Sequence, residues 1–127
     1  MEVSAPRVLP GEEVVRQMRS CDVLLFVRGG ISSRRGSAIA GIACGLPVVA
    51  WEGAETAYPI TEAGVVFADP KTQRGIGEAL LRVLSDEEYR ASLAERSRRV
   101  QERYFSWKAI AERYAEGLRS TDARPVR

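Results

Sequence analysis

The sequence predicts an α/β fold: a partial Rossmann-like parallel sheet with flanking helices and a helical carboxyl-terminal segment. Three short apolar segments, at residues 22–27, 47–51 and 64–67, are typical of buried strands. Helical patterns lie between and after them, and strands separated by helices favour parallel pairing in one sheet. A chain of 127 residues has the length of one domain with its own core.

The composition excludes several classes of site and partner. The chain has 19 Lys and Arg against 17 Asp and Glu, so its charge gives no argument for nucleic acid or an anionic membrane. It contains no histidine, which excludes a histidine-based triad, and two separated cysteines cannot form a thiolate zinc site. Cys21 and Cys44 lie among apolar residues, which predicts buried, reduced thiols. We therefore expect a cytoplasmic protein with no metal site, signal peptide or membrane span.

The first part of the chain is expected to hold an arm, a short helix and a strand. Residues 1–10 contain Pro6 and Pro10 and can supply at most an edge strand or an extended arm. Apolar residues then recur at helical spacing behind an acidic first turn, which predicts a short surface helix. They are Val14, Val15, Met18 and Cys21. The run at residues 22–27 is bounded by charge and by glycines, the pattern of a strand covered on both faces.

The central part is expected to contain a small-residue helix and two further strands. From Ser37 to Cys44 nearly every residue is small and apolar, which predicts a buried helix. Gly45 suits the left-handed position after a helix end, and Pro47 prevents continuation. The second strand follows at once, with Trp51 as a core residue. The third, at residues 64–67, ends before an Ala-Asp-Pro turn.

The remainder is predicted to be helical. One apolar stripe comprises Ile76, Leu80, Val83 and Leu84, and a second comprises Tyr89, Leu93, Val100 and Tyr104. A capping box from Ser85 to Glu88 is expected to start the second of these helices, and Ser106 to cap a last one. The helical period of Trp107 and Tyr114 predicts packing residues. Residues 1–120 are expected to form the domain, and residues 121–127 a flexible tail.

Four arginines in the penultimate helix resemble a basic patch. They are Arg96, Arg98, Arg99 and Arg103. Glu95 and Glu102 stand at helical spacing from two of them, which favours ion pairing on a solvated face over nucleic-acid binding.

The best candidate for a binding site is the glycine-rich loop after the first strand. Such a turn before a helix leaves several N–H groups unpaired, and the helix dipole adds positive charge there. Hydroxyls can donate to phosphate oxygens, and a guanidinium group binds two oxygens at once. The predicted phosphate-binding residues are Gly29, Gly30, Ser32, Ser33, Arg34, Arg35, Gly36 and Ser37. The alternative is an exposed turn in which glycines permit tight geometry and arginines confer solubility, although the position after a buried strand favours binding.

Four segments share their order and spacing with a known family. They are Cys21–Phe26, Ala43–Ala50, Gly64–Pro70 and Phe105–Tyr114. Together they resemble the carboxyl-terminal part of group-one, GT-B-type retaining glycosyltransferases, over about residues 8–118. The resemblance implies binding of a nucleotide-diphosphate sugar at the carboxyl ends of the strands, as donor substrate and without a cofactor. It also implies that Glu52, Gly53 and Glu55 line a donor-sugar rim.

The sequence departs from this family in two respects. Ser32 and Ala40 stand where many members carry two glutamates, the second of which holds the ribose hydroxyls, so ribose recognition is not carried over. Such transferases are also considerably longer, with an acceptor domain and two further donor-domain strands. We therefore expect a piece of a larger enzyme or a truncated reading frame, with no catalytic residue of its own.

Two functions are consistent with these patterns. The first is the donor-binding portion of a glycosyltransferase, inactive as this chain alone. The second is a non-catalytic α/β module, degenerate at the site, that serves oligomerisation or partner binding. Because the family's additional strands would lie beside residues 22–27, we expect an exposed apolar edge here. The chain would cover it as a homo-oligomer, such as a homodimer, by edge pairing or exchange of residues 1–10, or by folding that arm back.

Overall fold

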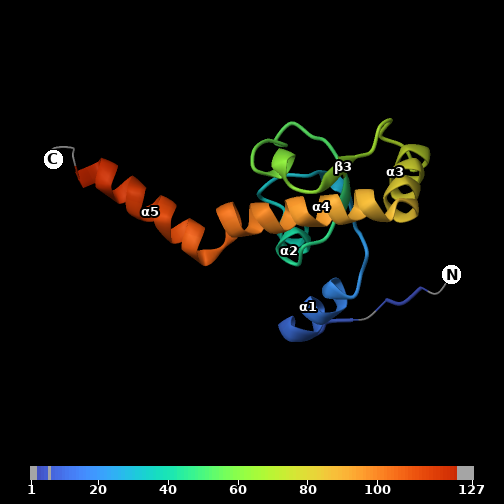
Figure 1. Ribbon diagram of the computed structural model, residues 1–127, viewed down its shortest axis with the longest axis horizontal. Coiled ribbons are helices and arrows are strands. Elements are labelled where there is room, and N and C mark those ends of the chain that lie inside the picture. Colours follow the sequence, from blue (N-terminus) through green and yellow to red (C-terminus); the bar gives the residue numbers. More distant parts are fainter. Residues whose placement is uncertain (1–2, 6, 123–127) are drawn as a thin grey trace.

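The computed structural model describes residues 3–5 and 7–122, and it confirms the predicted α/β fold (Figure 1). A three-stranded parallel sheet in the order β1-β2-β3 lies at the centre of the molecule. The strands are β1 (Leu24–Gly30), β2 (Val48–Trp51) and β3 (Val65–Phe67). The helices are α1 (Gly11–Arg19), α2 (Gly36–Ala43), the 3₁₀ turn η1 (Ile60–Glu62), α3 (Gln73–Ser85), α4 (Glu87–Val100), the π-helical segment η2 (Gln101–Phe105) and α5 (Trp107–Asp122).

The parallel register brings the carboxyl ends of the three strands to one edge of the sheet. Residues 24–26 of β1 lie opposite 48–50 of β2, which lie opposite 65–67 of β3. The register of β1 against β2 shifts after Phe26, so that Gly30 lies opposite Trp51. Such an irregularity bends the end of a strand. In this chain it falls where β1 runs into the glycine-rich loop.

Two apolar clusters cover the two faces of the sheet. Val48 and Ala50 of β2 belong to one cluster and Val49 to the other, as the alternation of side chains along a strand requires. All three are 0% exposed, so β2 is the centre of the core. The first cluster also contains Phe26, Ile31, Ala38, Ile42, Ile60, Val65 and Val100, and the second Ala68, Val83 and Leu93.

A buried hydroxyl fixes α4 against the loops that precede β2 and β3. Ser97 is 0% exposed; its Oγ accepts the N–H of Gly64 at 3.1 Å and donates to the carbonyl of Leu46 at 2.8 Å. A Cβ added to Gly64 would lie 2.9 Å from that Oγ and closer still to the backbone of Leu93. Helix and loop therefore meet at close range, and α4 crosses the sheet at a fixed position.

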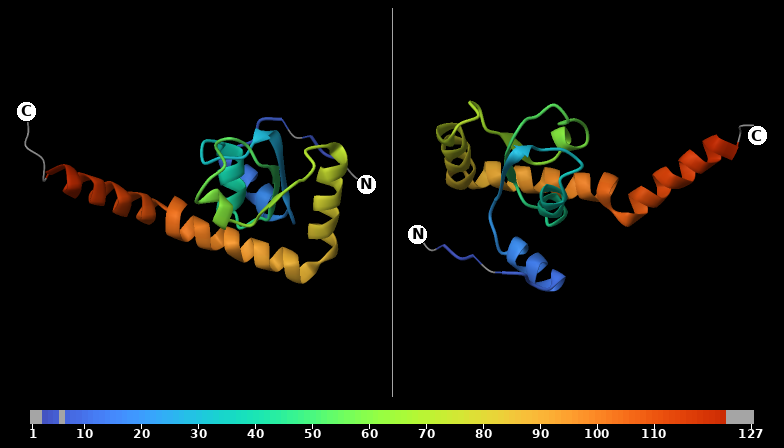
Figure 2. Two further views of the ribbon diagram at one scale, coloured as in Figure 1. Left: turned by 90° about the horizontal axis from the view of Figure 1, so that it is seen from above. Right: turned by 180° about the vertical axis from the view of Figure 1, so that it is seen from behind.

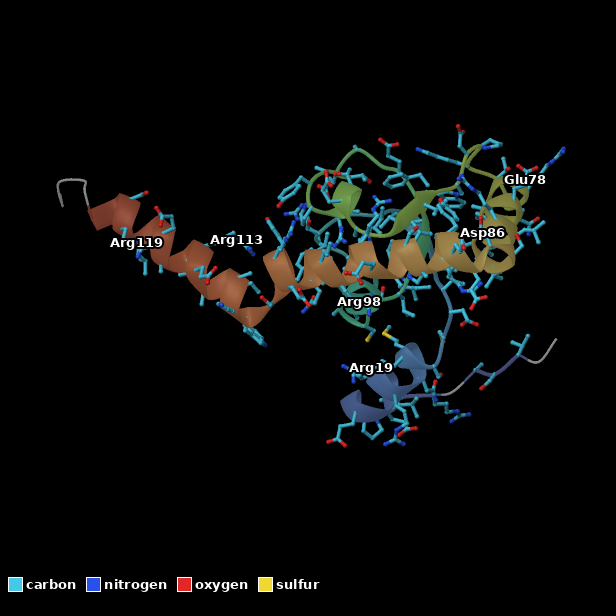
Figure 3. The ribbon with its side chains drawn as sticks, viewed as in Figure 1. Arg19, Glu78, Asp86, Arg98, Arg113 and Arg119 are labelled. Atoms are coloured by element: carbon cyan, nitrogen blue, oxygen red, sulfur yellow. The ribbon has the colours of Figure 1, made fainter. Side chains whose placement is uncertain are left out.

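The helix ends agree with the sequence patterns except at α4. Gly45 has φ +73°, which confirms the predicted left-handed position, and Ser106 Oγ accepts the N–H of Ala109 at 3.1 Å, which confirms the predicted cap of α5. The capping box at Ser85 is wrong, because α3 continues through that residue. Asp86 takes the role, accepting the N–H of Tyr89 at 3.0 Å where α3 meets α4 (Figure 3).

The prediction that the first strand is covered on both faces is wrong. Leu25 is 44% exposed, because β1 is an edge strand and α3 packs against β2 rather than against β1. The prediction of two buried thiols is also wrong: Cys21 is exposed just after α1, and Cys44 is only half-buried. Both cysteines are free.

The prediction that α5 packs through its aromatic residues is wrong as well. Trp107 is 86% exposed and Tyr114 73% exposed, since α5 bends away from α4 and projects from the body (Figure 2). The helical period of these residues is real, but periodicity identifies residues on one face and not what covers that face. α5 also continues through Asp122, into the predicted tail of residues 121–127, of which residues 123–127 lie outside the described residues.

The amino-terminal segment lies apart from the sheet. α1 is the predicted surface helix and buries none of its residues. Val3 is 79% and Val8 100% exposed, and Figure 2 shows this arm away from β1, so its described residues do not cover the strand edge. No helix in the described part of the chain combines the length and apolar character needed to cross a membrane.

Candidate functional site

The predicted site lies where the chain leaves the carboxyl ends of the three strands. The ends of β2 and β3 enclose a cleft of about 560 Å³. The cleft is lined by residues 52–54, 67–69 and Lys71. On the other side of β2, the end of β1 leads through residues 31–35 to the start of α2. The predicted phosphate loop and the predicted donor-sugar rim therefore lie at one edge of the sheet.

Close backbone contact joins the first two strand ends. A Cβ added to Gly30 would lie 2.5 Å from the Cα of Gly53, so only glycine fits at this approach. The N–H of Ile31 donates to the carbonyl of Trp51 at 2.9 Å. The Thr56 hydroxyl accepts the N–H of Gly53 at 2.9 Å and donates to the carbonyl of Ile31. The loops after β1 and β2 consequently form one connected surface.

The loop after β1 turns around the hydroxyl of Ser32. This residue is 3% exposed, and its Oγ accepts the N–H of Arg34 at 3.2 Å, while its carbonyl accepts the N–H of Arg35 at 3.1 Å. The turn raises the Arg34 side chain over the rim, where Nη1 lies 3.1 Å from Oε1 of Glu55. The two side chains are 80% and 61% exposed, and an ion pair so exposed stabilises by about 0–1 kcal/mol. Arg34 is thus weakly held and accessible to an anion.

Arg35 and the start of α2 supply further positive charge beside Arg34. Gly29 has φ +82°, a left-handed conformation that glycine adopts freely, and a Cβ there would lie 3.2 Å from Nη2 of Arg35. The Arg35 guanidinium therefore reaches back over the end of β1. Arg35 is also the N-cap of α2 and provides no side-chain cap. The N–H groups of the first turn, at residues 36–38, are therefore without a capping side chain, and the helix dipole adds to their positive character.

The structure thus brings two pairs of the sequence-predicted residues into contact. Arg34 lies against Glu55, and Gly30 lies against Gly53. Ser32 lies inside the turn. Ser33, Gly36 and Ser37 are exposed at the start of α2. The phosphate-binding role of these residues stays a prediction, whereas the packing of Gly30 on Gly53 is a role that the sequence did not indicate.

Two charged residues of the cleft were missed by the sequence interpretation. Asp69 and Lys71 follow β3 and line the cleft with Glu52. Their type carries no signal, because acidic and basic residues are common in exposed loops. Their position in the sequence does indicate the site, since they follow the third parallel strand and must lie at the same edge of the sheet. The cleft therefore carries two carboxylates and one ammonium group, while both guanidinium groups lie on the side of α2.

A protein-family model described as Glycosyl transferase-like matches residues 2–116 of the chain. The matched range contains all three described strands, the helices from α1 to η2 and the first part of α5. No curated protein and no solved structure matches the chain.

Proposed function

Because the chain belongs to the glycosyl transferase-like family, we propose that it is the donor-binding portion of a glycosyltransferase and holds a nucleotide-diphosphate sugar at the carboxyl edge of its sheet. The observation that carries this proposal is the positive group at the end of β1: Arg34, Arg35 and the uncapped first turn of α2. Guanidinium forks and helix N–H groups bind phosphate oxygens well. In open α/β sheets, ligands bind at this edge.

The distribution of charge supports one orientation of the donor. The diphosphate is attracted to the α2 side, where the guanidinium groups lie, and is repelled by Glu52 and Asp69 in the cleft. Carboxylates accept hydrogen bonds from sugar hydroxyls, so the cleft suits the sugar. In this orientation the diphosphate replaces Glu55 as the partner of Arg34. The same positive groups would stabilise the leaving diphosphate during transfer.

Thermal unfolding with added UDP, GDP or ADP tests the proposal. A ligand at 100 times its dissociation constant raises the stability of the folded state by about 2.7 kcal/mol, so at least one nucleotide is expected to raise the melting temperature. Arg34→Ala is expected to remove most of that rise. Arg16→Ala is the matched control, because the Arg16 side chain is comparably exposed and pairs with Glu13 at 2.8 Å on α1, away from the site.

Two outcomes would contradict the proposal. If no nucleotide changes the melting temperature, the site is degenerate and the chain is a non-catalytic module. If Arg34→Ala responds like wild type, nucleotide binds elsewhere.

A specific observation also supports self-association. Within the described part of the chain, β1 has a neighbouring strand on one side only. Leu25 on this strand is 44% exposed, and Val27 is half-buried. An uncovered apolar edge strand pairs readily with a second one. We therefore propose a homodimer formed by β1 pairing, in line with the sequence expectation. Sedimentation velocity over a range of protein concentrations measures it, and a monomer at every concentration would refute it.

A further inference from the structure

A second pocket lies between α4 and the segment that precedes β3. Its volume is about 420 Å³, and it shares no residue with the cleft at the strand ends. Its charged and aromatic lining residues are Tyr58, Glu62, Arg96, Arg99, Arg103 and Tyr104, and we refer to them as the α4 pocket. Three guanidinium groups face one carboxylate, so the pocket has an excess of positive charge.

The three arginines come from one side of a continuous helical segment. Arg96, Arg99 and Arg103 are three and four residues apart, a spacing that makes them neighbours, and like charges at this spacing destabilise a helix. Arg96 is fixed by hydrogen bonds, because its Nε donates to the carbonyl of Glu62 and its Nη2 to the carbonyl of Thr61, both at 3.3 Å. Arg96 thus connects α4, on one side of the pocket, to η1 on the other side.

The ion pairs of α4 leave part of this positive charge uncompensated. Glu95 pairs with Arg98 and also lies 3.5 Å from Nε of Arg99, so one carboxylate serves two guanidinium groups. Arg103 has no acidic partner among the described residues. An anion entering the α4 pocket would therefore meet one free guanidinium group and one that shares its counter-charge.

Aromatic rings fix the far side of the α4 pocket. The Tyr104 ring meets Tyr58 edge-on at 5.6 Å between centroids, and Arg113 of α5 covers its face at 3.8 Å. Tyr104 belongs to the π-helical segment η2. At the end of this segment, the N–H of Ser106 donates to the carbonyl of Gln101 at 2.7 Å. Such segments redirect side chains and are frequent at functional sites. Tyr58 is 65% exposed, so its ring and hydroxyl are available to a ligand.

We propose that the α4 pocket binds the phosphate group of a small phosphate monoester whose ring system rests on Tyr58. A guanidinium group matches two phosphate oxygens, and the volume suits a small molecule. The adjoining hollow along α5 shares Arg103 with the α4 pocket, whereas its remaining charged residues balance: Glu112 and Glu116 against Arg113 and Arg119 (Figure 3). The positive excess therefore does not extend along α5 beyond Arg103. This confinement disfavours a long polyanion such as nucleic acid. The proposal is independent of the donor site at the strand ends.

NMR titration of the full chain with inorganic phosphate and with phenyl phosphate tests this assignment, with chloride at matched ionic strength as the reference. We expect saturable shifts in the backbone signals of residues 96–104, with phenyl phosphate binding more tightly than phosphate. Arg103→Gln is expected to weaken both ligands by about tenfold, as loss of one charge-assisted contact predicts. Tyr58→Ala is expected to abolish the tighter binding of phenyl phosphate and to leave the affinity for inorganic phosphate unchanged.

Arg74→Gln is the matched control for this titration. It removes the same charge from α3, outside the α4 pocket, where the Arg74 side chain is 87% exposed and pairs with Glu78, a carboxylate that contacts no arginine of the pocket. The proposal is overturned if Arg74→Gln weakens binding as much as Arg103→Gln, because charge screening alone would then explain it. Shifts confined to residues 32–38 would also overturn it, while supporting phosphate binding at the donor loop.

Discussion

Ser97→Ala is expected to destabilise the chain by about 3 kcal/mol. The substitution leaves the N–H of Gly64 and the carbonyl of Leu46 without the partner that they have at 3.1 and 2.8 Å, in a position that is 0% exposed. Each buried polar group left unsatisfied costs about 1–3 kcal/mol, and the higher helix propensity of alanine offsets about 0.5 kcal/mol. For a domain of this size the loss corresponds to a fall in melting temperature of about 12 °C.

Ser92→Ala isolates the contribution of the buried hydroxyl. Ser92 is on the same helix, but its Oγ is exposed and donates to the carbonyl of Tyr89 at 2.7 Å. The two variants share the gain in helix propensity, so their difference reports the bonds of Ser97. Urea unfolding followed by far-ultraviolet circular dichroism should shift the midpoint of Ser97→Ala with an unchanged slope. A difference below about 0.5 kcal/mol, the range of ordinary surface substitutions, would refute the assignment of Ser97 as the anchor of α4.

Two further substitutions, each paired with a control, test the contact between the strand ends and the exposed edge of the sheet. Gly30→Ala is expected to lower stability by about 2 kcal/mol or more, because its Cβ would lie 2.5 Å from the Cα of Gly53, whereas Gly36→Ala, with nothing within 4 Å, should be neutral or stabilising in a thermal melt. Leu25→Lys is expected to abolish self-association measured by sedimentation without changing the circular dichroism spectrum, since a charge on an edge strand opposes pairing. Leu81→Lys, at a residue of α3 that is 67% exposed, should leave association intact; equal effects of the two lysines would refute pairing through β1.

The three strands and their parallel arrangement were predictable, because local patterns indicate both. Continuous apolar runs bounded by glycine and proline mark β2 and β3, and the parallel arrangement follows from the helices around them. The boundaries of β1 were less predictable. The strand begins at Leu24 and includes Gly29 and Gly30, because backbone pairing to β2 continues where the apolar run has ended. Backbone pairing between strands depends on the tertiary structure, so the residue types of β1 alone do not predict where the strand ends.

Burial was the least predictable property, and α5 shows the reason. Trp107 and Tyr114 lie at helical spacing, and in a compact domain such residues are usually covered. Coverage depends on where the helix axis points, however, and α5 leaves the body after Ser106. The same limit applied to the arginines of α4 and η2. The expected pair between Glu95 and Arg99 is present, but Glu95 also pairs with Arg98, and Arg103 lies in the α4 pocket.

Gly29 and Gly30 illustrate how far residue type can define the candidate site. In the sequence they are equivalent members of a phosphate loop, because glycine signals only that a side chain is not tolerated or that an unusual conformation is needed. The structure separates these two causes: Gly29 has φ +82° and lies beside Arg35, while Gly30 is extended and packs on Gly53. A loss of nucleotide binding in Gly30→Ala would therefore report a displaced strand end rather than a lost phosphate contact. The donor-site hypothesis has to be tested at Arg34 and Arg35, whose side chains are exposed and can be removed without disturbing the sheet.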